Sequence, residues 1–345
     1  MDARLRDSLN MVSGLTPARI ANAARVWSSY QYSRWKGRPI VSGMPMSVSI
    51  EPTTSCNLRC PECPSGLRAF TRPTGMLQPG LFRDVIDQLA PTLNYLTFYF
   101  QGEPYLHPNF LEMIAYAGRK GIYTATSTNG HYLTDEVARA TVESGLDRLI
   151  ISIDGTTQKT YESYRVGGSL DKVLDGASRI VHYKRKLRAP SPHVIFQFLV
   201  VKPNEHQIDD ARALAKKIGV DELVLKTAQI YNYQQGSDLM PENPRYARYR
   251  RKADGTYEIK NRMLNECWRM WQGCVITWDG KVLPCCFDKD GTYAMGDLRQ
   301  TAFRDIWFNE KYKTFRESLF RSRAEIEMCR NCTSGTAPSG DVVMG

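Results

Sequence analysis

Three cysteines stand close together in the stretch Glu51–Gly66, which reads EPTTSCNLRCPECPSG. Cys56, Cys60 and Cys63 follow one another with Cys-x3-Cys-x2-Cys spacing. Three neighbouring thiols cannot all pair with one another, so they either have distant disulfide partners or hold a metal. The rest of the sequence is needed to choose between these two interpretations.

The composition of the chain favours a metal site over disulfide bonds. The 345 residues are 42% hydrophobic and 24% charged, which is ordinary for a globular protein with a full core and an accessory module. The start MDARLRDSLNMV has no apolar secretory segment, and the longest apolar runs are too short to span a bilayer. We therefore expect a cytoplasmic protein, in which thiols stay reduced and nine cysteines indicate metal or redox chemistry.

Half of the net charge of +10 lies in a short basic arm, residues 1–43, which we expect to be helical. The rest of the chain is nearly balanced, so nucleic acid is not indicated as a specific partner. Thr16 and Pro17 predict the start of a helix over 17–36. This helix either packs on the main domain or makes peripheral contact with an anionic membrane. The charged side chains in residues 1–38 are Arg4, Arg6, Arg19, Arg25, Arg34, Lys36 and Arg38, against Asp2 and Asp7.

A strand–helix rhythm begins at residue 46 and repeats six times. Such a pattern predicts parallel strands with helices outside, and six units are fewer than a closed eight-stranded barrel needs. The expected fold is therefore α/β, a partial (β/α)6 TIM barrel over 44–235, with the cysteine loop after its first strand. Strands are expected at 46–51, 95–100, 124–129, 148–154, 194–201 and 222–228, with helices at 80–90, 109–119, 134–144, 170–186 and 206–217.

Three further regions follow the barrel. Residues 236–264 are polar and charged, which predicts a linker. Residues 265–333 contain the other six cysteines and are expected to form a small β-hairpin and helix module. Residues 334–345 are expected to be a flexible tail.

The first cysteine set suits an iron–sulfur cluster. Soft thiolates favour such clusters, and three of them reach three corners of a [4Fe–4S] cube. Structural zinc would want a fourth protein ligand, and no histidine stands at a recognisable spacing. A cluster with three protein ligands leaves one iron open for a substrate or cofactor.

The motif CNLRCPEC (56–63) resembles the Cx3Cx2C motif of the radical SAM superfamily, and QGEP (101–104) is similar to its GGEP segment. The segments STNG (127–130), ISIDG (151–155) and YESYRVGG (161–168) follow in the family's order, so the resemblance covers about 46–230. It implies that the open iron binds S-adenosylmethionine (SAM), whose reductive cleavage yields a 5′-deoxyadenosyl radical. It also implies a reducing partner such as flavodoxin or ferredoxin.

The resemblance implies SAM contacts from residues at the ends of the strands. Two positions depart from the family pattern, because Gln101 replaces a glycine and Glu62 stands where relatives often have an aromatic residue. For four of these residues an ordinary structural role competes with contact to SAM. Glu103 would cap a turn, Ser152 and Asp154 would be turn residues, and Arg165 would be a surface ion-pair partner. His107 is expected to be structural. The implied contacts are Gln101, Gly102, Glu103, Pro104, Ser127, Asn129, Ser152, Asp154 and Arg165.

The C-terminal cysteines, with GDL (296–298) and IW (306–307), resemble the SPASM/twitch extension that carries auxiliary [4Fe–4S] clusters. Six cysteines are too few for two such clusters, so the resemblance implies one. Zinc is the competing metal. The implied ligands are Cys267, Cys285, Cys329 and Cys332.

A hairpin gives an independent view of these ligands. Asp279-Gly280 predicts a two-residue turn, which pairs Trp278 with Lys281 and sets Cys274 opposite Cys285. Cys274 therefore competes with Cys267 as a ligand. Cys286 would point to the other sheet face as a small buried hydrophobe. Asp288 is a weak candidate for a catalytic base, with a role at the hairpin end as the alternative.

Three classes of function are considered. Hydrogen abstraction from a small polar substrate, sugar-like or aminocyclitol-like, with the auxiliary cluster accepting an electron, is favoured. Modification of a ribosomally made peptide is the alternative, although residues 1–43 are too few for the winged-helix domain that many such enzymes carry. A non-enzymatic electron carrier is disfavoured by the SAM-like segments.

Overall fold

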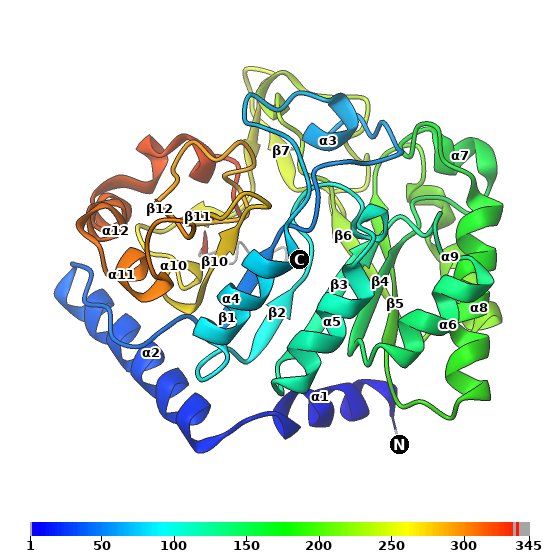
Figure 1. Cartoon of the computed structure of the whole chain (residues 1–345). Coiled ribbons are helices and arrows are strands. Elements are labelled where there is room, and N and C mark those ends of the chain that lie inside the picture. Colours follow the sequence, from blue (N-terminus) through cyan, green and yellow to red (C-terminus); the bar gives the residue numbers. More distant parts are fainter. Residues whose placement is uncertain (1, 334–335, 338–345) are drawn as a thin grey trace.

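The computed structural model describes residues 2–333 and 336–337, and a nine-stranded sheet crosses this part of the chain. Strands β1 to β6 are parallel and adjacent in chain order, and helices cover the outside of the sheet (Figure 1). The predicted partial barrel is confirmed. Its strands are β1 Ser47–Ile50, β2 Tyr95–Thr97, β3 Tyr123–Thr128, β4 Arg148–Ser152, β5 His193–Val200 and β6 Glu222–Thr227, and its main helices are α4 Pro79–Leu89, α5 Phe110–Arg119, α6 Asp135–Glu143, α8 Leu170–Lys186 and α9 Ile208–Ile218.

Two helices form the N-terminal arm, α1 (Ala3–Ser13) and α2 (Pro17–Lys36). The predicted start of α2 is confirmed, because the Thr16 side chain accepts a hydrogen bond from the backbone N–H of Arg19 at 3.3 Å. The helix ends at Gly37, whose φ of 64° is the left-handed conformation common after a helix. Within the described residues, neither these helices nor any other is long and apolar enough to cross a bilayer.

The C-terminal module continues the barrel sheet. Strand β10 pairs in parallel with β1, and β11 and β12 extend the sheet antiparallel (Figure 1). The buried side chains of Trp271, Trp307 and Tyr312 belong to the same hydrophobic core as the barrel. Module and barrel are therefore one packed unit. The module comprises α10 Arg269–Gln272, β10 Gly273–Ile276, β11 Lys281–Leu283, β12 Gly296–Asp297, α11 Phe303–Trp307 and α12 Glu310–Ser322.

The predicted register of the β10–β11 hairpin is wrong by one residue. Val275 pairs with Leu283 and Ile276 with Val282, so the turn holds three residues, 278–280. A two-residue type I′ turn needs positive φ at both positions, whereas here only Gly280 has it, at 83°. Cys274 therefore does not lie opposite Cys285.

Residues 236–264, which their composition predicts to be a linker, contain a hairpin of β7 (Tyr249–Arg251) and β8 (Tyr257–Ile259). Strand β9 (Arg262–Met263) then pairs with β13 (Thr336–Ala337), so two residues of the expected tail form a strand. The rest of the expected tail lies outside the described residues.

Short helices α3 (Pro64–Leu67) and α7 (Gln158–Glu162) lie at the carboxyl ends of the strands (Figure 1).

Candidate active site

The first three cysteines lie on the loop that leaves β1. The loop is closed by a hydrogen bond from the backbone N–H of Cys63 to the Cys60 carbonyl at 3.3 Å, and by one from the Leu58 N–H to the Cys56 sulfur at 3.5 Å. Leu58 is buried and anchors the loop from within. Burial raises the pKa of the Cys56 thiol to about 11, so iron would have to displace its proton.

Two glycines let the family-like segments approach this loop. A Cβ on Gly66 would lie 2.5 Å from the backbone nitrogen of Cys60. A Cβ on Gly102 would lie 2.3 Å from the Thr53 carbonyl oxygen, and Gly102 has a φ of 74°. The Glu103 N–H donates to the Ser55 carbonyl at 2.7 Å. The QGEP turn therefore packs directly against the cysteine loop.

Glu103 lies almost fully buried beside the cysteines. Its carboxylate accepts hydrogen bonds from the Thr128 hydroxyl at 2.8 Å, the Asn129 N–H at 2.7 Å and the Tyr105 N–H at 3.2 Å. Burial raises the pKa of Glu103 to about 7, despite these donors. The interpretation of Glu103 as a turn cap agrees with the Tyr105 bond. The Asn129 side chain donates to the Cys56 sulfur at 3.8 Å.

Arg165 and Asp154 form an ion pair on the other side of the loop. The side chains are 16% and 1% exposed, with nitrogen and oxygen 2.5 Å apart. Asp154 also accepts a hydrogen bond from the Leu199 N–H at 2.7 Å, and Arg165 donates to the Cys60 sulfur at 3.8 Å. Arg165 is thus an ion-pair partner, but a buried one. Its cation faces a cysteine sulfur, as expected beside an anionic cluster or a carboxylate.

The remaining predicted SAM contacts lie at the same end of the sheet. Gln101 is buried, Pro104 begins a short 3-10 helix, Ser127 lies on β3, and Ser152 ends β4. His107, in contrast, bonds through its ring to the Leu77 carbonyl oxygen at 2.7 Å and accepts from the Asn109 N–H at 3.1 Å. These bonds agree with a structural role for this histidine.

Three cysteines of the module, Cys267, Cys329 and Cys332, lie around Arg323, and a fourth, Cys285, lies near Cys332. Burial by itself would lower the pKa of Arg323, but the charges of Cys267, Cys332 and Cys329 raise it. The neighbouring Cys286 and burial raise the pKa of Cys285, and the charge of Cys332 adds to the rise. All four thiols are buried, although they come from three separate segments of the chain.

The other two cysteines have different surroundings. Cys274 lies on β10, and burial raises its pKa while the charge of Arg316 lowers it. Cys286 is not on the opposite sheet face from Cys285: the two thiols are hydrogen-bonded neighbours, and Arg269 donates to the Cys286 sulfur at 3.9 Å. The expected alternation fails because β11 ends at Leu283, before both cysteines.

Among the described side chains, no three of cysteine, histidine or carboxylate type converge tightly enough to share one metal ion. A four-iron cube binds each cysteine through a different iron, so its ligands stand apart. The donor sets, with arginine and amide N–H groups aimed at sulfur, fit clusters of this kind.

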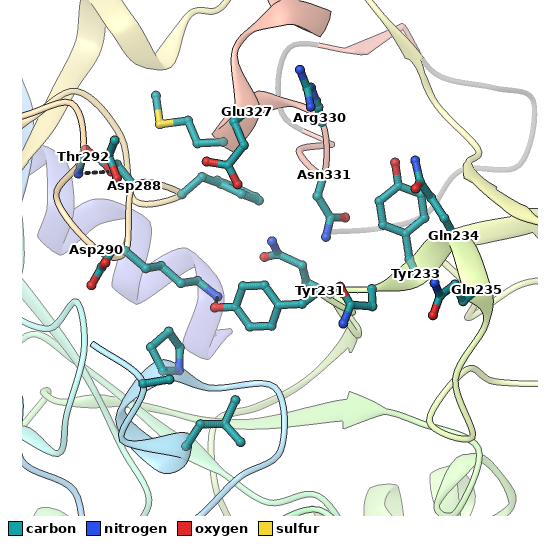
Figure 2. Close-up of a pocket in the computed structure, with 18 residues that line it drawn as sticks. Tyr231, Tyr233, Gln234, Gln235, Asp288, Asp290, Thr292, Glu327, Arg330 and Asn331 are labelled. Carbon is teal, nitrogen blue, oxygen red and sulfur yellow. Dashed lines mark hydrogen bonds between the residues drawn. The ribbon is translucent and has the colours of Figure 1, made fainter. Parts of the chain in front are cut away.

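A cavity of about 620 Å³ separates the two cysteine sets (Figure 2). Its walls are helix α3 with Ala69 just beyond it, the loop that follows β6, and two segments of the module. Figure 2 shows Tyr231 in the middle, with Asp288 and Asp290 on one side and Asn331 on another. The lining residues are Pro64, Leu67, Ala69, Gln229, 231–235, 287–290, Thr292, 327–328 and 330–331.

The loop after β6 is tied to both cysteine sets. The Tyr231 N–H donates to the Glu62 carboxylate at 2.9 Å, next to Cys63. On the other side, the Asn331 amide donates to the Ile230 carbonyl at 2.7 Å, from within the Cys329–Cys332 segment. Glu62, which replaces the family's usual aromatic residue, therefore has a structural role here.

Two neighbouring module residues meet the cavity differently. Asp288 accepts hydrogen bonds from the backbone N–H groups of Thr292 and Tyr293 at 2.8 and 2.9 Å, as expected of a turn residue (Figure 2). Burial raises the pKa of Asp288. Lys289 instead donates from its Nζ to the Tyr231 hydroxyl at 2.9 Å.

Tyr231, Lys289 and Asn331 are absent from the site expected from the sequence. A signal exists for the first of them, because IYNYQQ (230–235) directly follows the sixth strand, at the barrel end where active sites form. Lys289 and Asn331 meet this loop only through tertiary folding.

The comparisons with known families agree with this architecture. The profile described as Radical SAM superfamily matches residues 50–215, and the SPASM profile, an iron-sulfur cluster-binding domain, matches residues 267–333. The chain belongs to the radical SAM superfamily and carries a C-terminal SPASM domain. It is an enzyme that uses [4Fe–4S] clusters and SAM.

Three curated relatives cover most of the chain. A tungsten-containing aldehyde ferredoxin oxidoreductase cofactor-modifying protein from Pyrococcus furiosus is 26% identical, over 77% of this chain and 82% of the relative. A PqqA peptide cyclase from Gluconobacter oxydans is 27% identical, over 84% and 82%. A SAM-dependent 2-deoxy-scyllo-inosamine dehydrogenase from Niallia circulans is 23% identical, over 83% and 92%.

Solved structures share the fold. SuiB of Streptococcus suis bound to SAM aligns with a TM-score of 0.62 at 12% identity, covering 84% of this chain and 71% of SuiB. BtrN in complex with AdoMet and 2-DOIA aligns with a TM-score of 0.51 at 18% identity, covering 88% of this chain and all of BtrN.

Proposed function

We propose that this enzyme dehydrogenates a small polar molecule, sugar-like or aminocyclitol-like, in the cavity between the two cysteine sets. When bound, SAM and the clusters would supply a 5′-deoxyadenosyl radical that takes a hydrogen atom from the substrate, and an acceptor for the electron that remains after a proton leaves. The observation that carries the proposal is the position of the cavity, whose walls include α3 beside Cys63 and segments beside Cys285 and Cys329. An external donor such as flavodoxin or ferredoxin would provide the electron that cleaves SAM.

The surroundings of the cysteines support a specific set of ligands. Cys56, Cys60 and Cys63 would hold the SAM-binding cluster, with Asn129 and Arg165 donating to two of the sulfurs. The residues at the strand ends from Gln101 to Arg165 would surround SAM. One auxiliary cluster would use the three thiols around Arg323, those of Cys267, Cys329 and Cys332, and the thiol of Cys285 near Cys332.

Cys274 is the weaker candidate for the auxiliary cluster. It lines a small pocket with Cys285 and Cys286, but the arginine charge that acts on it is that of Arg316, whereas Cys267 lies near Arg323. Asp288 is a poor candidate for a base, because two backbone N–H groups already use its oxygens.

The size and lining of the cavity support a small polar substrate. A volume of about 620 Å³ is in the range of sites that enclose one small molecule, roughly 300–1,000 Å³. The hydroxyl of Tyr231 and the cation of Lys289 lie within hydrogen-bonding distance of each other on its wall. Together they could hold a substrate hydroxyl and fix which C–H bond faces the radical. The relative named as a 2-deoxy-scyllo-inosamine dehydrogenase supports the same class.

Peptide modification is the competing class, supported by the relative named PqqA peptide cyclase. The experiment that separates the two uses reconstituted enzyme, SAM and dithionite without oxygen. Substrates are 2-deoxy-scyllo-inosamine and sugars deuterated at their carbinol carbons. We expect deuterium in 5′-deoxyadenosine and a ketone product from at least one of them. If none raises SAM cleavage above the substrate-free rate while a peptide does, the proposal is wrong.

A matched pair of variants tests the cavity itself. Tyr231→Phe should lower kcat/KM for the substrate roughly tenfold, since a hydrogen bond to a charged group is worth about 1.5 kcal/mol or more. SAM cleavage without substrate should not change. Tyr116→Phe also removes a bonded hydroxyl, but one that donates to Asp87 on the exposed surface, and it should leave both rates unaltered. Equal effects of the two changes would refute the role of Tyr231.

A further inference from the structure

The two N-terminal helices bury polar side chains and expose apolar ones, the reverse of an ordinary surface helix. Helix α2 turns Arg19, Asn22 and Ser33 toward the protein. Arg19 donates to the carbonyl oxygens of Ala90 and Lys120, both at 2.9 Å. The side chains of Asn22 and Ser33 likewise bond to backbone groups of the segment that leads to β1. Helix α2 is therefore held in place by these polar side chains together with Val26 and Tyr30, which are buried in the main hydrophobic core.

Helix α1 is attached in the same way. Buried Asp7 accepts a hydrogen bond from the Tyr123 hydroxyl and forms an ion pair with Arg148, and Asn10 donates to Asp147 at 2.7 Å. Tyr123 and Arg148 are the first residues of β3 and β4. Helix α1 and the start of α2 therefore cover the amino end of the barrel, opposite the cysteine loop, and the rest of α2 runs along the module, where Tyr30 packs on Trp268 and Trp271 (Figure 1).

The outward faces of these helices carry most of the exposed large apolar side chains. Eight of the fourteen such residues in the described part of the chain lie in α1 and α2. Trp27 is 58% exposed and Trp35 is 73% exposed, and Lys36 lies over the Trp35 ring at 4.0 Å. The other members of this apolar face are Leu5, Leu9, Met11, Val12, Ile20 and Tyr32.

Basic side chains dominate the charge around this apolar face, with exposed Asp2 before α1 and Glu266 paired with Arg34 as exceptions. No aspartate or glutamate occurs between Asp7 and Glu51. Exposed basic residues accompany the aromatic rings, among them Arg25, Lys36 and Arg38. Tryptophan and tyrosine with lysine and arginine, and few carboxylates, form the composition that binds the interface of an anionic bilayer.

We propose that α1 and α2 dock the enzyme on an anionic membrane surface through the apolar face defined above. The helices would lie in the interface rather than cross it, as their polar inner faces stay bonded to the barrel. Because the arm covers the amino end of the strands, the cavity at the carboxyl end would face away from the lipid. The docked enzyme would thus remain open to a water-soluble substrate.

The test is co-sedimentation of the full-length reconstituted enzyme with lipid vesicles. We expect it to pellet with phosphatidylcholine vesicles that contain about one-third phosphatidylglycerol, and much less with phosphatidylcholine alone. High salt should weaken the binding, because it screens surface charge. A protein that stays in the supernatant with the anionic vesicles at low salt overturns the proposal.

Matched variants make the test specific. Trp27→Gln with Trp35→Gln should weaken vesicle binding at least about tenfold, since two largely exposed indoles would lose their burial in lipid. Leu187→Gln with Phe308→Gln, at 39% and 38% exposed positions elsewhere, should bind normally. SAM cleavage should be unchanged in both, which reports intact folding. If the tryptophan variant pellets as well as the parent, the proposal fails. It also fails if the parent is a dimer without lipid that this variant dissociates, because the apolar face would then bind a second copy.

Discussion

Replacing Arg72 by Met should destabilise the contact between barrel and module. Arg72 lies between α3 and α4 and forms two hydrogen bonds with Glu51, at 2.6 and 2.9 Å. The two side chains are 9% and 0% exposed. A third nitrogen of Arg72 donates to the Lys289 carbonyl in the cavity wall at 3.0 Å. Removing one partner of a buried ion pair costs about 3–5 kcal/mol, or roughly 4–7 °C in melting temperature for a chain of this size.

The loss should depend on pH with a definite sign. Burial raises the pKa of Glu51, and Arg72 opposes that rise. Without Arg72 the folded-state pKa of Glu51 should rise further above its unfolded value. Such a carboxyl costs nothing at low pH, where it is protonated in both states. The loss of stability from burying its charge begins when the pH exceeds the pKa in the unfolded chain. The loss is complete when the pH exceeds the pKa in the folded protein. The stability difference between parent and variant should therefore grow with pH.

Thermal melting of the reconstituted proteins without oxygen, at about pH 6 and about pH 8.5, measures this difference. Arg83→Met is the control, because Arg83 pairs with Glu112 at the surface, where both are at least half exposed, and should cost less than about 1 kcal/mol. Adding Glu51→Gln to Arg72→Met should recover part of the loss. If Arg72→Met melts like the control, or if its deficit shrinks as the pH rises, the reasoning is wrong.

Four further predictions concern the clusters and their loop. The reconstituted enzyme should hold about eight iron and about eight sulfide, and about four of each once the three cysteines of the first loop are replaced by alanine; roughly one zinc in place of the second four irons would contradict this. Cys267→Ala should lose about four irons while Cys274→Ala keeps them, so equal iron contents would reject the ligand assignment. Cys329→Ala, if circular dichroism and protease resistance show it folded, should still form 5′-deoxyadenosine but little product, and normal turnover would remove the acceptor role. Gly102→Ala should impair SAM cleavage much more than Gly145→Ala. Both glycines have positive φ, but only at Gly102 would the new Cβ meet a backbone atom, the Thr53 carbonyl oxygen at 2.3 Å. Similar cleavage rates in the two variants would show that the close approach is not needed.

Features set by local spacing could be predicted from the sequence. The strand and helix periods define the six barrel units, and the helix cap at Thr16 locates the start of α2. The spacing of Cys56, Cys60 and Cys63 indicates an iron–sulfur site after β1. These patterns need only neighbouring residues, because side-chain direction repeats with a fixed period along a helix or strand.

Only the tertiary structure decided how distant segments meet. The turn at 278–280 has three residues because Gly280 alone takes positive φ, and the register of Cys274 shifts with it. The pairing of β10 with β1, and the hydrogen bonds that tie the loop after β6 to Glu62 and Asn331, join residues far apart in the chain. The apolar side chains of α1 and α2 point outward because polar side chains of these helices are buried in bonds to the rest of the protein. The helical pattern by itself would place the apolar side chains on the buried face instead. Long-range contacts depend on packing in three dimensions, and a period along one segment carries no information about its partner.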